Sequence, residues 1–190
     1  MSINQLRLVK FNIGNSEEEL FLLNAFNSPD ALLFWSTSGK KYEDIKAVLS
    51  QLDRNLGDYK IFLGLSSNVP KALFIAHGIS YKNGHCEILA YIDLSVRRKA
   101  STYLWWVMLL ERLHQGKINR IFAKIFSSNI PSKSSAVQAG FVLCGILPEY
   151  MYDNGKAIDI EIYTRETKLT EFESYWLAKI TNYDKTHLII

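Results

Sequence analysis

A short basic segment is the part of the sequence whose residue types point most clearly to chemistry. It reads Arg97-Arg98-Lys99-Ala100-Ser101-Thr102 and lies between an apolar, strand-like run and the strongest helical pattern of the chain. Backbone N–H groups and the positive end of a helix dipole favour an anion at such a junction, and three cations add to the attraction. The segment therefore predicts a phosphate or pyrophosphate site. A solvent-exposed basic loop capped by Ser101 or Thr102 is an equally good interpretation of these residues alone.

The composition disfavours several other kinds of site. Cys86 and Cys144 are the only cysteines, and no CxxC motif or neighbouring histidine cluster accompanies them, so we expect no metal site and no disulfide framework. A formal net charge of +3 from 22 basic and 19 acidic residues is too dilute to indicate nucleic acid binding. No apolar run reaches the roughly 18 residues of a membrane-spanning helix, and no secretory leader is visible. We therefore expect a cytoplasmic protein that does not enter a membrane.

The elements around the basic segment follow from hydrophobic periodicity. Residues 86–94 and 120–126 are rich in β-branched and apolar residues and are predicted to be strands. Between them, residues 101–115 carry apolar side chains at helical spacing, and Gly116 ends the run. A strand, helix, strand succession in one sheet requires a right-handed crossover and parallel pairing of the two strands.

The rest of the chain reads as alternating strands and helices. Strands are predicted over 4–11, 59–65, 72–81, 141–146 and 157–164, with hairpin turns at 83–84 and 153–155. Helices are predicted after Asn15 or Ser16, from near Lys41 to Gly57, and over 132–139. Thr170 and Glu173 form a capping-box pattern at the start of a tail helix. The prediction is one α/β domain, residues 1–168, with a mixed, mostly antiparallel sheet flanked by helices, and a helical extension, residues 169–190, packed on it.

Two groups of residues give the chain a resemblance to a known family. The basic hexad resembles the hallmark of the GNAT N-acetyltransferases, which is Arg or Gln, two residues, Gly, one residue, then Gly or Ala; Arg97 fits, and Ala100 and Thr102 stand at the two small positions. The second group, in order and spacing, resembles the Rim-type branch, which acetylates N-terminal amines of ribosomal proteins and includes relatives that act on small amines. Its residues are Asn129-Ile130-Pro131-Ser132, Gly140-Phe141, Gly145, Gly155, Asp159 and Tyr163.

The resemblance implies a role for each residue of the acyl-coenzyme A site. The backbone N–H of Ile92 would polarise the thioester carbonyl, and Leu94 would pair with the pantetheine chain like an added strand. The pyrophosphate would be wrapped by the amides of Arg98, Lys99, Ala100, Ser101 and Thr102, and the 3′-phosphate reached by Arg97, Arg98 and Lys99. Asn129 would contact the pantetheine arm, and Ser132 would lie near the departing sulfur.

The family's reaction is direct attack of an amine on the thioester, which requires a base and a proton donor for the thiolate. Glu87 is the preferred base because it lies on the strand that leads to Ile92, although an ordinary exposed carboxylate is an equally good interpretation. His85 shares its strand face, and Tyr150, Tyr152 and Asp159 are expected on the opposite wall of the acceptor site. Many family members place a tyrosine as general acid where this chain has Ala136, so Ser132 or water would replace it. Ser132 is also a candidate helix N-cap.

The prediction is an N-acetyltransferase that uses acetyl-coenzyme A and a primary amine, which would be a peptide N-terminus, an amino sugar or another small amine. Two alternatives remain open. Ala100, Thr102 and the missing tyrosine favour a member of the fold that has lost catalysis and serves as a binding module. The basic loop would also suit an acyl carrier protein, or a longer acyl-coenzyme A, as donor. An exposed strand could pair two copies into a homodimer, and the sequence does not decide this.

Overall fold

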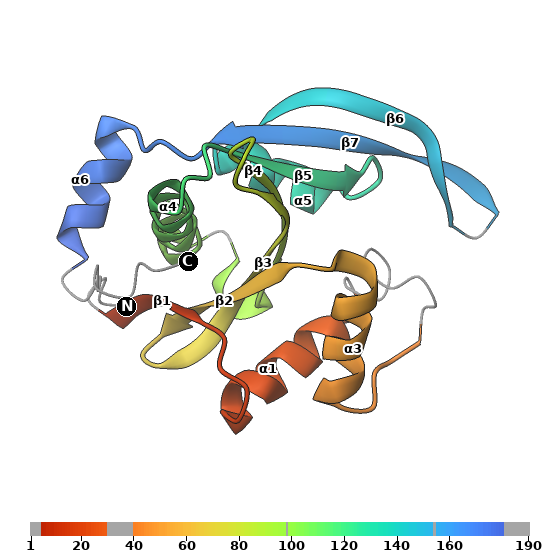
Figure 1. Ribbon diagram of the computed structural model, residues 1–190, viewed down its shortest axis with the longest axis horizontal. Helices are drawn as coiled ribbons and strands as arrows, with labels where there is room; N and C mark the ends of the chain where they lie inside the picture. Colours follow the sequence, from red (N-terminus) through yellow and green to blue (C-terminus); the bar gives the residue numbers. More distant parts are fainter. Residues whose placement is uncertain (1–4, 30–39, 98, 154, 181–190) are drawn as a thin grey trace.

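The sheet at the centre of the molecule has the strand order β1-β2-β3-β4-β5-β7-β6 (Figure 1). The computed structural model describes residues 5–29, 40–97, 99–153 and 155–180. The strands in these residues are β1 (Leu6–Lys10), β2 (Tyr59–Ser66), β3 (Val69–Ser80), β4 (His85–Ile92), β5 (Arg120–Phe126), β6 (Val142–Asp153) and β7 (Lys156–Glu166). The helices are α1 (Ser16–Phe26), α3 (Ile45–Leu56), the 3-10 turn η2 (Leu94–Val96), α4 (Ala100–Gln115), α5 (Ile130–Gln138) and α6 (Glu171–Lys179). The α/β class, the mostly antiparallel sheet and the additional C-terminal helix are as predicted.

One strand pair in the described sheet is parallel. β4 and β5, which α4 connects, pair only at His85 with Arg120, Cys86 with Ile121 and Glu87 with Phe122. All other neighbouring strands pair antiparallel. The parallel pairing around the α4 crossover was predicted, but its early end at Glu87 was not, and this end creates the site described below.

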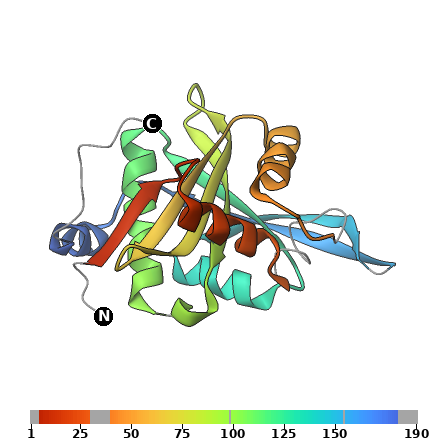
Figure 2. The ribbon, with the colours of Figure 1, turned by 90° about the horizontal axis from the view of Figure 1, so that it is seen from below.

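Two apolar layers hold the sheet between helices. Alternate residues of β3 point to opposite faces, so Phe74 packs into a core with α4 and α5, whereas Leu73 and Ile75 pack into a second core with α1 and α3. Figures 1 and 2 show the twisted sheet between these helices, and Figure 2 shows the β6–β7 hairpin extending beyond them. The helices on each face therefore hold β4 in place from both sides, whereas β5 packs into the core with α4 and α5.

Trp105 fixes α4 against the sheet. Its side chain is fully buried, and its indole N–H donates to the carbonyl oxygen of Leu65 at 3.3 Å. The ring lies over Gly64, where a Cβ atom would be 2.7 Å from the indole Cδ2. The close approach of α4 to β2 thus depends on the absence of a side chain at this position.

Several predicted boundaries shift for local reasons. The strand predicted to reach residue 94 ends at Ile92, because Asp93 accepts the N–H of Ser95 and begins the η2 turn. The helix predicted from near Lys41 begins at Ile45, where Asp44 caps it. The strand predicted over 141–146 continues to residue 153, since its pairing with β7 resumes beyond a bulge. The start of the strand predicted over 4–11 and the turn residue at 154 lie outside the described residues.

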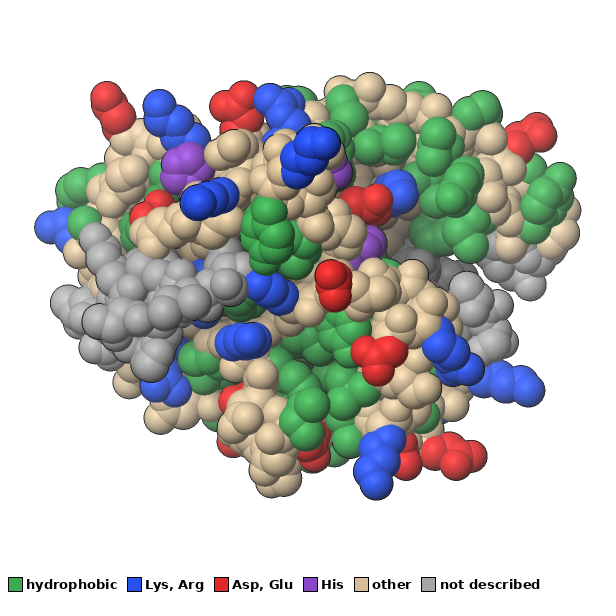
Figure 3. Space-filling model, viewed as in Figure 1, with side chains coloured by type: hydrophobic (Ala, Val, Ile, Leu, Met, Phe, Trp, Pro, Cys, Tyr) green, Lys and Arg blue, Asp and Glu red, His purple; other side chains and the backbone are tan. Residues whose placement is uncertain are grey.

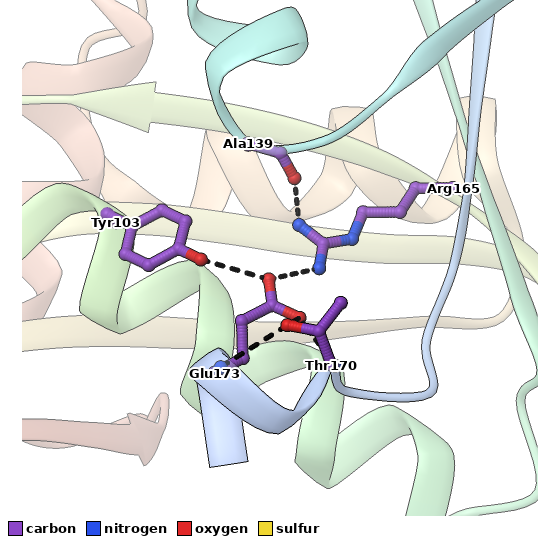
Figure 4. A network of polar contacts seen from close by, with 5 residues as sticks. All are labelled: Tyr103, Ala139, Arg165, Thr170 and Glu173. Atoms are coloured by element: carbon purple, nitrogen blue, oxygen red, sulfur yellow. Dashed lines mark hydrogen bonds and ion pairs between the residues drawn. The ribbon is translucent and has the colours of Figure 1, made fainter. Parts of the chain in front are cut away.

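The tail helix packs against α4 through a buried network of polar groups (Figure 4). Glu173 forms an ion pair with Arg165, and the two side chains are only 4% and 8% exposed. Arg165 also donates to the carbonyl oxygen of Ala139, and Tyr103 of α4 donates to Glu173 at 3.2 Å. Thr170 and Glu173 form the predicted capping box. The predicted docked helix is therefore confirmed, and its contacts join the ends of β7, α5 and α4.

Candidate functional site

The first feature of the site is an opened edge of β4. Beyond Glu87, β4 continues to Ile92 without a strand partner on its β5 side among the described residues. The N–H of Asp93 donates to the carbonyl oxygen of Lys71 in β3 at 2.9 Å. Because backbone N–H groups alternate along a strand, those of Ala90 and Ile92 point to the opposite, opened edge. This edge can therefore donate hydrogen bonds to an extended ligand.

The turn after β4 is closed by the side chain of Arg97. Its Nε donates to the carbonyl oxygen of Ile92 at 2.9 Å, so the guanidinium folds back on the end of the strand. Leu94, in η2, has a 74% exposed side chain. The structure thus places Ile92, Leu94 and Arg97 together at one end of the opened edge.

The N-terminus of α4 follows directly and has no side-chain cap. Lys99 is the N-cap residue and makes no capping hydrogen bond with its side chain. Thr102 instead donates its hydroxyl to the carbonyl oxygen of Val96 at 2.9 Å, and the Ser101 hydroxyl is buried without a partner among the described residues. The alternative of a loop capped by Ser101 or Thr102 is therefore wrong. Ala100 is exposed beside Lys99, and Arg98 lies outside the described residues. A helix N-terminus left without a capping side chain is suited to an anion.

A cluster of titratable side chains lies on the sheet face that α1 and α3 cover, where the β4–β5 pairing ends. Glu87 forms an ion pair with Lys124 of β5, with 3.0 Å between Oε1 and Nζ, and His77 of β3 lies directly opposite Glu87 in the register. Figure 3 shows histidine, acidic and basic side chains together where the surface is hollowed between its two halves. His85 packs edge-to-face on Phe122, with 5.9 Å between the ring centroids. The cluster therefore combines an imidazole, a carboxylate and a primary amine.

Burial lowers the pKa of His77; the charge of Glu87 opposes this shift and the charge of Lys124 adds to it. His77 is therefore neutral near pH 7. His77 and Lys124 were not predicted as site residues. Both lie in alternating strand patterns, and only the register between strands brings them to Glu87.

Asn129 and Ser132 lie at the start of α5. Asn129 accepts the backbone N–H of Ser132 at 3.2 Å, so Asn129 is the N-cap and the interpretation of Ser132 as N-cap is wrong. Next to Ser132, Lys133 forms an ion pair with Glu161 at 2.8 Å, and Tyr163 donates to Glu161 at 2.6 Å. Burial and the bond to Glu161 raise the pKa of Tyr163 to about 12. This second cluster lies on the other face of the sheet, with α5.

The residues predicted for the wall of the acceptor site opposite Glu87 and His85 are only partly brought together. Asp159 accepts the N–H of Glu149 at 2.8 Å and thereby holds the bulge in β6, where Glu149 has a φ of 51°. Tyr150 and Tyr152 are 58% and 73% exposed. In the described residues neither tyrosine has a hydrogen bond or ring contact with Glu87 or His85. The structure thus places Asp159 in a structural contact and leaves the two tyrosines on the surface of the hairpin.

Within the described ranges, no group of three or more His, Cys, Asp or Glu side chains could hold a metal ion. None of the helices in the described part of the chain has the length and apolar character needed to cross a bilayer.

Solved structures of several N-acetyltransferases share the fold of this chain. Spermidine N-acetyltransferase from Vibrio cholerae, solved in complex with CoA and spermine, is 18% identical with a TM-score of 0.70, over 91% of this chain and 98% of that one. RimL, a ribosomal L7/L12 α-N-protein acetyltransferase solved with coenzyme A, is also 18% identical with a TM-score of 0.70, over 85% and 94%. A putative phosphinothricin N-acetyltransferase is 20% identical with a TM-score of 0.65, over 86% and 99%.

The sequence itself places the chain in a family. Residues 34–162, more than half of the chain, match the family described as Acetyltransferase (GNAT) domain, and the chain therefore belongs to the GNAT acetyltransferases. No curated protein matches it in sequence.

Proposed function

We propose that this protein is an N-acetyltransferase that transfers the acetyl group of acetyl-coenzyme A to a primary amine. The observation that carries the proposal is the opened β4 edge, with its outward N–H groups, next to the uncapped N-terminus of α4. The first can pair with an extended pantetheine arm and the second with a pyrophosphate. Among the GNAT branches, the Rim type is proposed from the residues between Asn129 and Tyr163.

The chain's own residues can hold each part of coenzyme A. Lys99 supplies positive charge beside the first turn of α4, and Ala100 and Thr102 lie in that turn. Arg98, outside the described residues, remains a proposed contact of the phosphates. Ile92 and Leu94 line the end of the opened edge. Asn129 uses its side-chain oxygen as a helix cap, which leaves its amide NH₂ group as the hydrogen-bond donor for the pantetheine arm. When bound, coenzyme A supplies the thioester whose carbonyl carbon is the electrophile.

The position of Glu87 bears on which amide polarises the thioester carbonyl. Ile92 lies five positions after Glu87, about 16 Å along a strand that rises about 3.3 Å per residue. A general base must reach the attacking amine directly or through one water. Ala90 points its N–H to the same edge and lies three positions from Glu87, about 10 Å away. Ile92 remains the proposed donor to the carbonyl, and Ala90 is a second candidate because it lies nearer to Glu87.

Two side chains could take the proton of the acceptor amine. Glu87 lies closest to the opened edge and is the proposed base. His77, opposite it, is neutral near pH 7 and can receive a proton passed on by Glu87 through water. On the other side of the sheet, Ser132 is proposed as the proton donor to the departing thiolate. Ala136, at the position of the family's tyrosine, is buried and offers no proton.

The acceptor is proposed as a class. Glu87 is a carboxylate at the opened edge, and a carboxylate attracts a protonated amine. The similar structures include proteins named for spermidine and for a ribosomal protein N-terminus. A peptide N-terminus, an amino sugar and a small amine or polyamine all present such a group. His85 lies two positions before Glu87 on β4 and remains a proposed contact of the acceptor. Tyr150, Tyr152 and Asp159, in the β6–β7 hairpin, also remain proposed contacts of the acceptor.

Partners other than an amine stay predictions. A homodimer would use an unpaired strand edge, and β1 and β6 are the two edge strands of the described sheet. Sedimentation velocity at two protein concentrations would test it.

Acyl carrier protein remains the alternative donor because Lys99 is exposed in the basic loop, which could contact an acidic partner.

The thermal midpoint with and without excess acetyl-coenzyme A tests the proposal. A ligand at about 100 times its Kd adds roughly 2.7 kcal/mol of stability, so we expect a clear upward shift. Lys99→Glu should reduce the shift because it places a negative charge at the N-terminus of α4. Lys46→Glu, the same charge change on α3, is the matched control and should leave it intact. No shift in the unchanged protein would contradict the proposal and favour a carrier-protein donor or a non-catalytic binding role.

A further inference from the structure

The ion pair between Glu87 and Lys124 places a primary amine of the chain itself at the proposed base. The Nζ of Lys124 is 3.0 Å from Oε1 of Glu87. Lys124 lies two positions beyond Phe122, the last residue of β5 that pairs with β4, and so it shares the sheet face of Glu87. Its backbone belongs to the strand that forms the other side of the opened edge. The amine thus lies where β4 and β5 part.

The pair is accessible. The Lys124 and Glu87 side chains are 39% and 32% exposed, so water and a small ligand can reach both. Among the described residues, Glu87 is the side chain to which Lys124 donates a hydrogen bond. A primary amine next to a carboxylate is also the arrangement that the proposed reaction needs from its acceptor.

We propose that Lys124 occupies the place of the acceptor amine and is itself a site of acyl transfer from acetyl-coenzyme A. This inference rests on the proposed function. Glu87 takes a proton from the Lys124 ammonium, and the freed Nζ attacks the thioester carbonyl carbon. The new N–C amide bond forms as the C–S bond breaks, and the nitrogen releases its second proton to water. The thiolate leaves and takes up a proton from water, either directly or through Ser132. The acetylated side chain is neutral, so it no longer forms an ion pair with Glu87.

A second lysine provides a control within the same chain. Lys133 forms an equally short ion pair with Glu161, at 2.8 Å, but the two side chains are 21% and 15% exposed. Glu161 is also bonded to Tyr163, and the pair lies on the opposite face of the sheet. An ion pair alone therefore does not predict acylation, whereas the position of Lys124 does.

Peptide mass mapping of the full chain after incubation with acetyl-coenzyme A tests the inference. We expect one acetyl group at Lys124 well before any at Lys133 or at the exposed Lys46. Glu87→Gln should slow labelling of Lys124 by about a hundredfold or more, the usual effect of losing a general base, and leave the other lysines unchanged. Lys124→Arg keeps a cation beside Glu87 without an acyl acceptor, and should lose the early label.

The thermal midpoint of the same samples separates two kinds of failure and shows that each variant is folded. Suppose that acetyl-coenzyme A raises the thermal midpoint, but Lys124 is labelled no faster than Lys46 or its labelling is unaffected by Glu87→Gln. That result overturns self-acylation and leaves the proposed function standing. If the thermal midpoint does not rise and Lys124 is not labelled, both proposals are overturned. A heat-unfolded sample gives the background reactivity of each lysine, and faster labelling of Lys124 there would also count against the inference.

Discussion

His77 shows how a single residue acquires a role from its neighbours in space. The groups that face it come from three other strands: Glu87 on β4, Lys124 on β5, and Tyr59 on β2, whose hydroxyl donates to Asp53 of α3. Burial is the largest influence on its imidazole and lowers its pKa. The neutral form is thus the one that the folded protein favours.

This shift predicts a pH dependence of stability. A pKa below the unfolded value of about 6.5 means that the unfolded chain binds the proton more tightly, so the free energy of unfolding falls as the pH drops below about 6.5. Urea unfolding at about pH 7.5 and at about pH 5.5 measures the loss. Between these two pH values, His77→Gln should lose less unfolding free energy than the unchanged protein. His114→Gln, at the far end of α4, is the control for removing an imidazole. Equal losses in the unchanged protein and His77→Gln would contradict the assignment.

The packing of α4 on β2 gives a prediction at the scale of elements. In Gly64→Ala the new Cβ would lie 2.7 Å from Cδ2 of Trp105 and 2.9 Å from Cβ of Ala72, so the helix or the strand must move. Overpacking of this kind costs about 1–3 kcal/mol of unfolding free energy. Denaturant unfolding measures it.

Gly145→Ala is the matched control for this change. Gly145 also lies in a strand, but the nearest atom to a Cβ there is Cδ1 of Ile162 at 3.9 Å. We expect a change within about 0.5 kcal/mol. If both variants unfold at the same denaturant concentration, the close approach of Trp105 is not what requires glycine at position 64.

At the scale of the whole molecule, the C-terminal helix closes a core that the rest of the chain leaves incomplete. Arg165 is buried at the end of β7, and its charge is matched by Glu173 of α6 (Figure 4). Burial alone would raise the pKa of Glu173, but the hydrogen bonds from Arg165 and Thr170 and the Arg165 charge outweigh it and lower the pKa. The proposed division at residue 168 therefore separates two parts that depend on each other.

Removal of this carboxylate should be costly. Glu173→Ala leaves the Arg165 charge buried without its partner, which costs about 3–5 kcal/mol in comparable pairs. Because the folded pKa is lowered, this contribution is complete above the unfolded pKa of about 4.3 and is lost as the pH falls through the folded value. Denaturant unfolding at neutral and acidic pH should show a difference between the two proteins that shrinks in acid. Glu171→Ala, an exposed first-turn residue of the same helix, should cost less than about 1 kcal/mol. If Glu173→Ala lost no more unfolding free energy than Glu171→Ala, the ion pair would not be what holds α6 in place.

The sequence by itself determined the local and repetitive features of this protein. Periodic apolar residues predicted α4, the parallel strand after it and the hairpin strands, and Thr170 with Glu173 predicted the start of α6. These signals are short-range, because helix caps and side-chain alternation depend on residues a few positions apart.

Only the tertiary structure decided which residues meet. The register of three strands brings His77, Glu87 and Lys124 together, although Lys124 is 37 positions from Glu87 in the sequence. The early end of the β4–β5 pairing, the turn of Arg97 back to Ile92 and the use of Asn129 rather than Ser132 as a helix cap likewise depend on how the elements pack. Strand alternation predicts which side chains of one strand lie on the same face of the sheet. It does not predict which residue of the neighbouring strand lies opposite them, because register is set by the packing of the whole sheet.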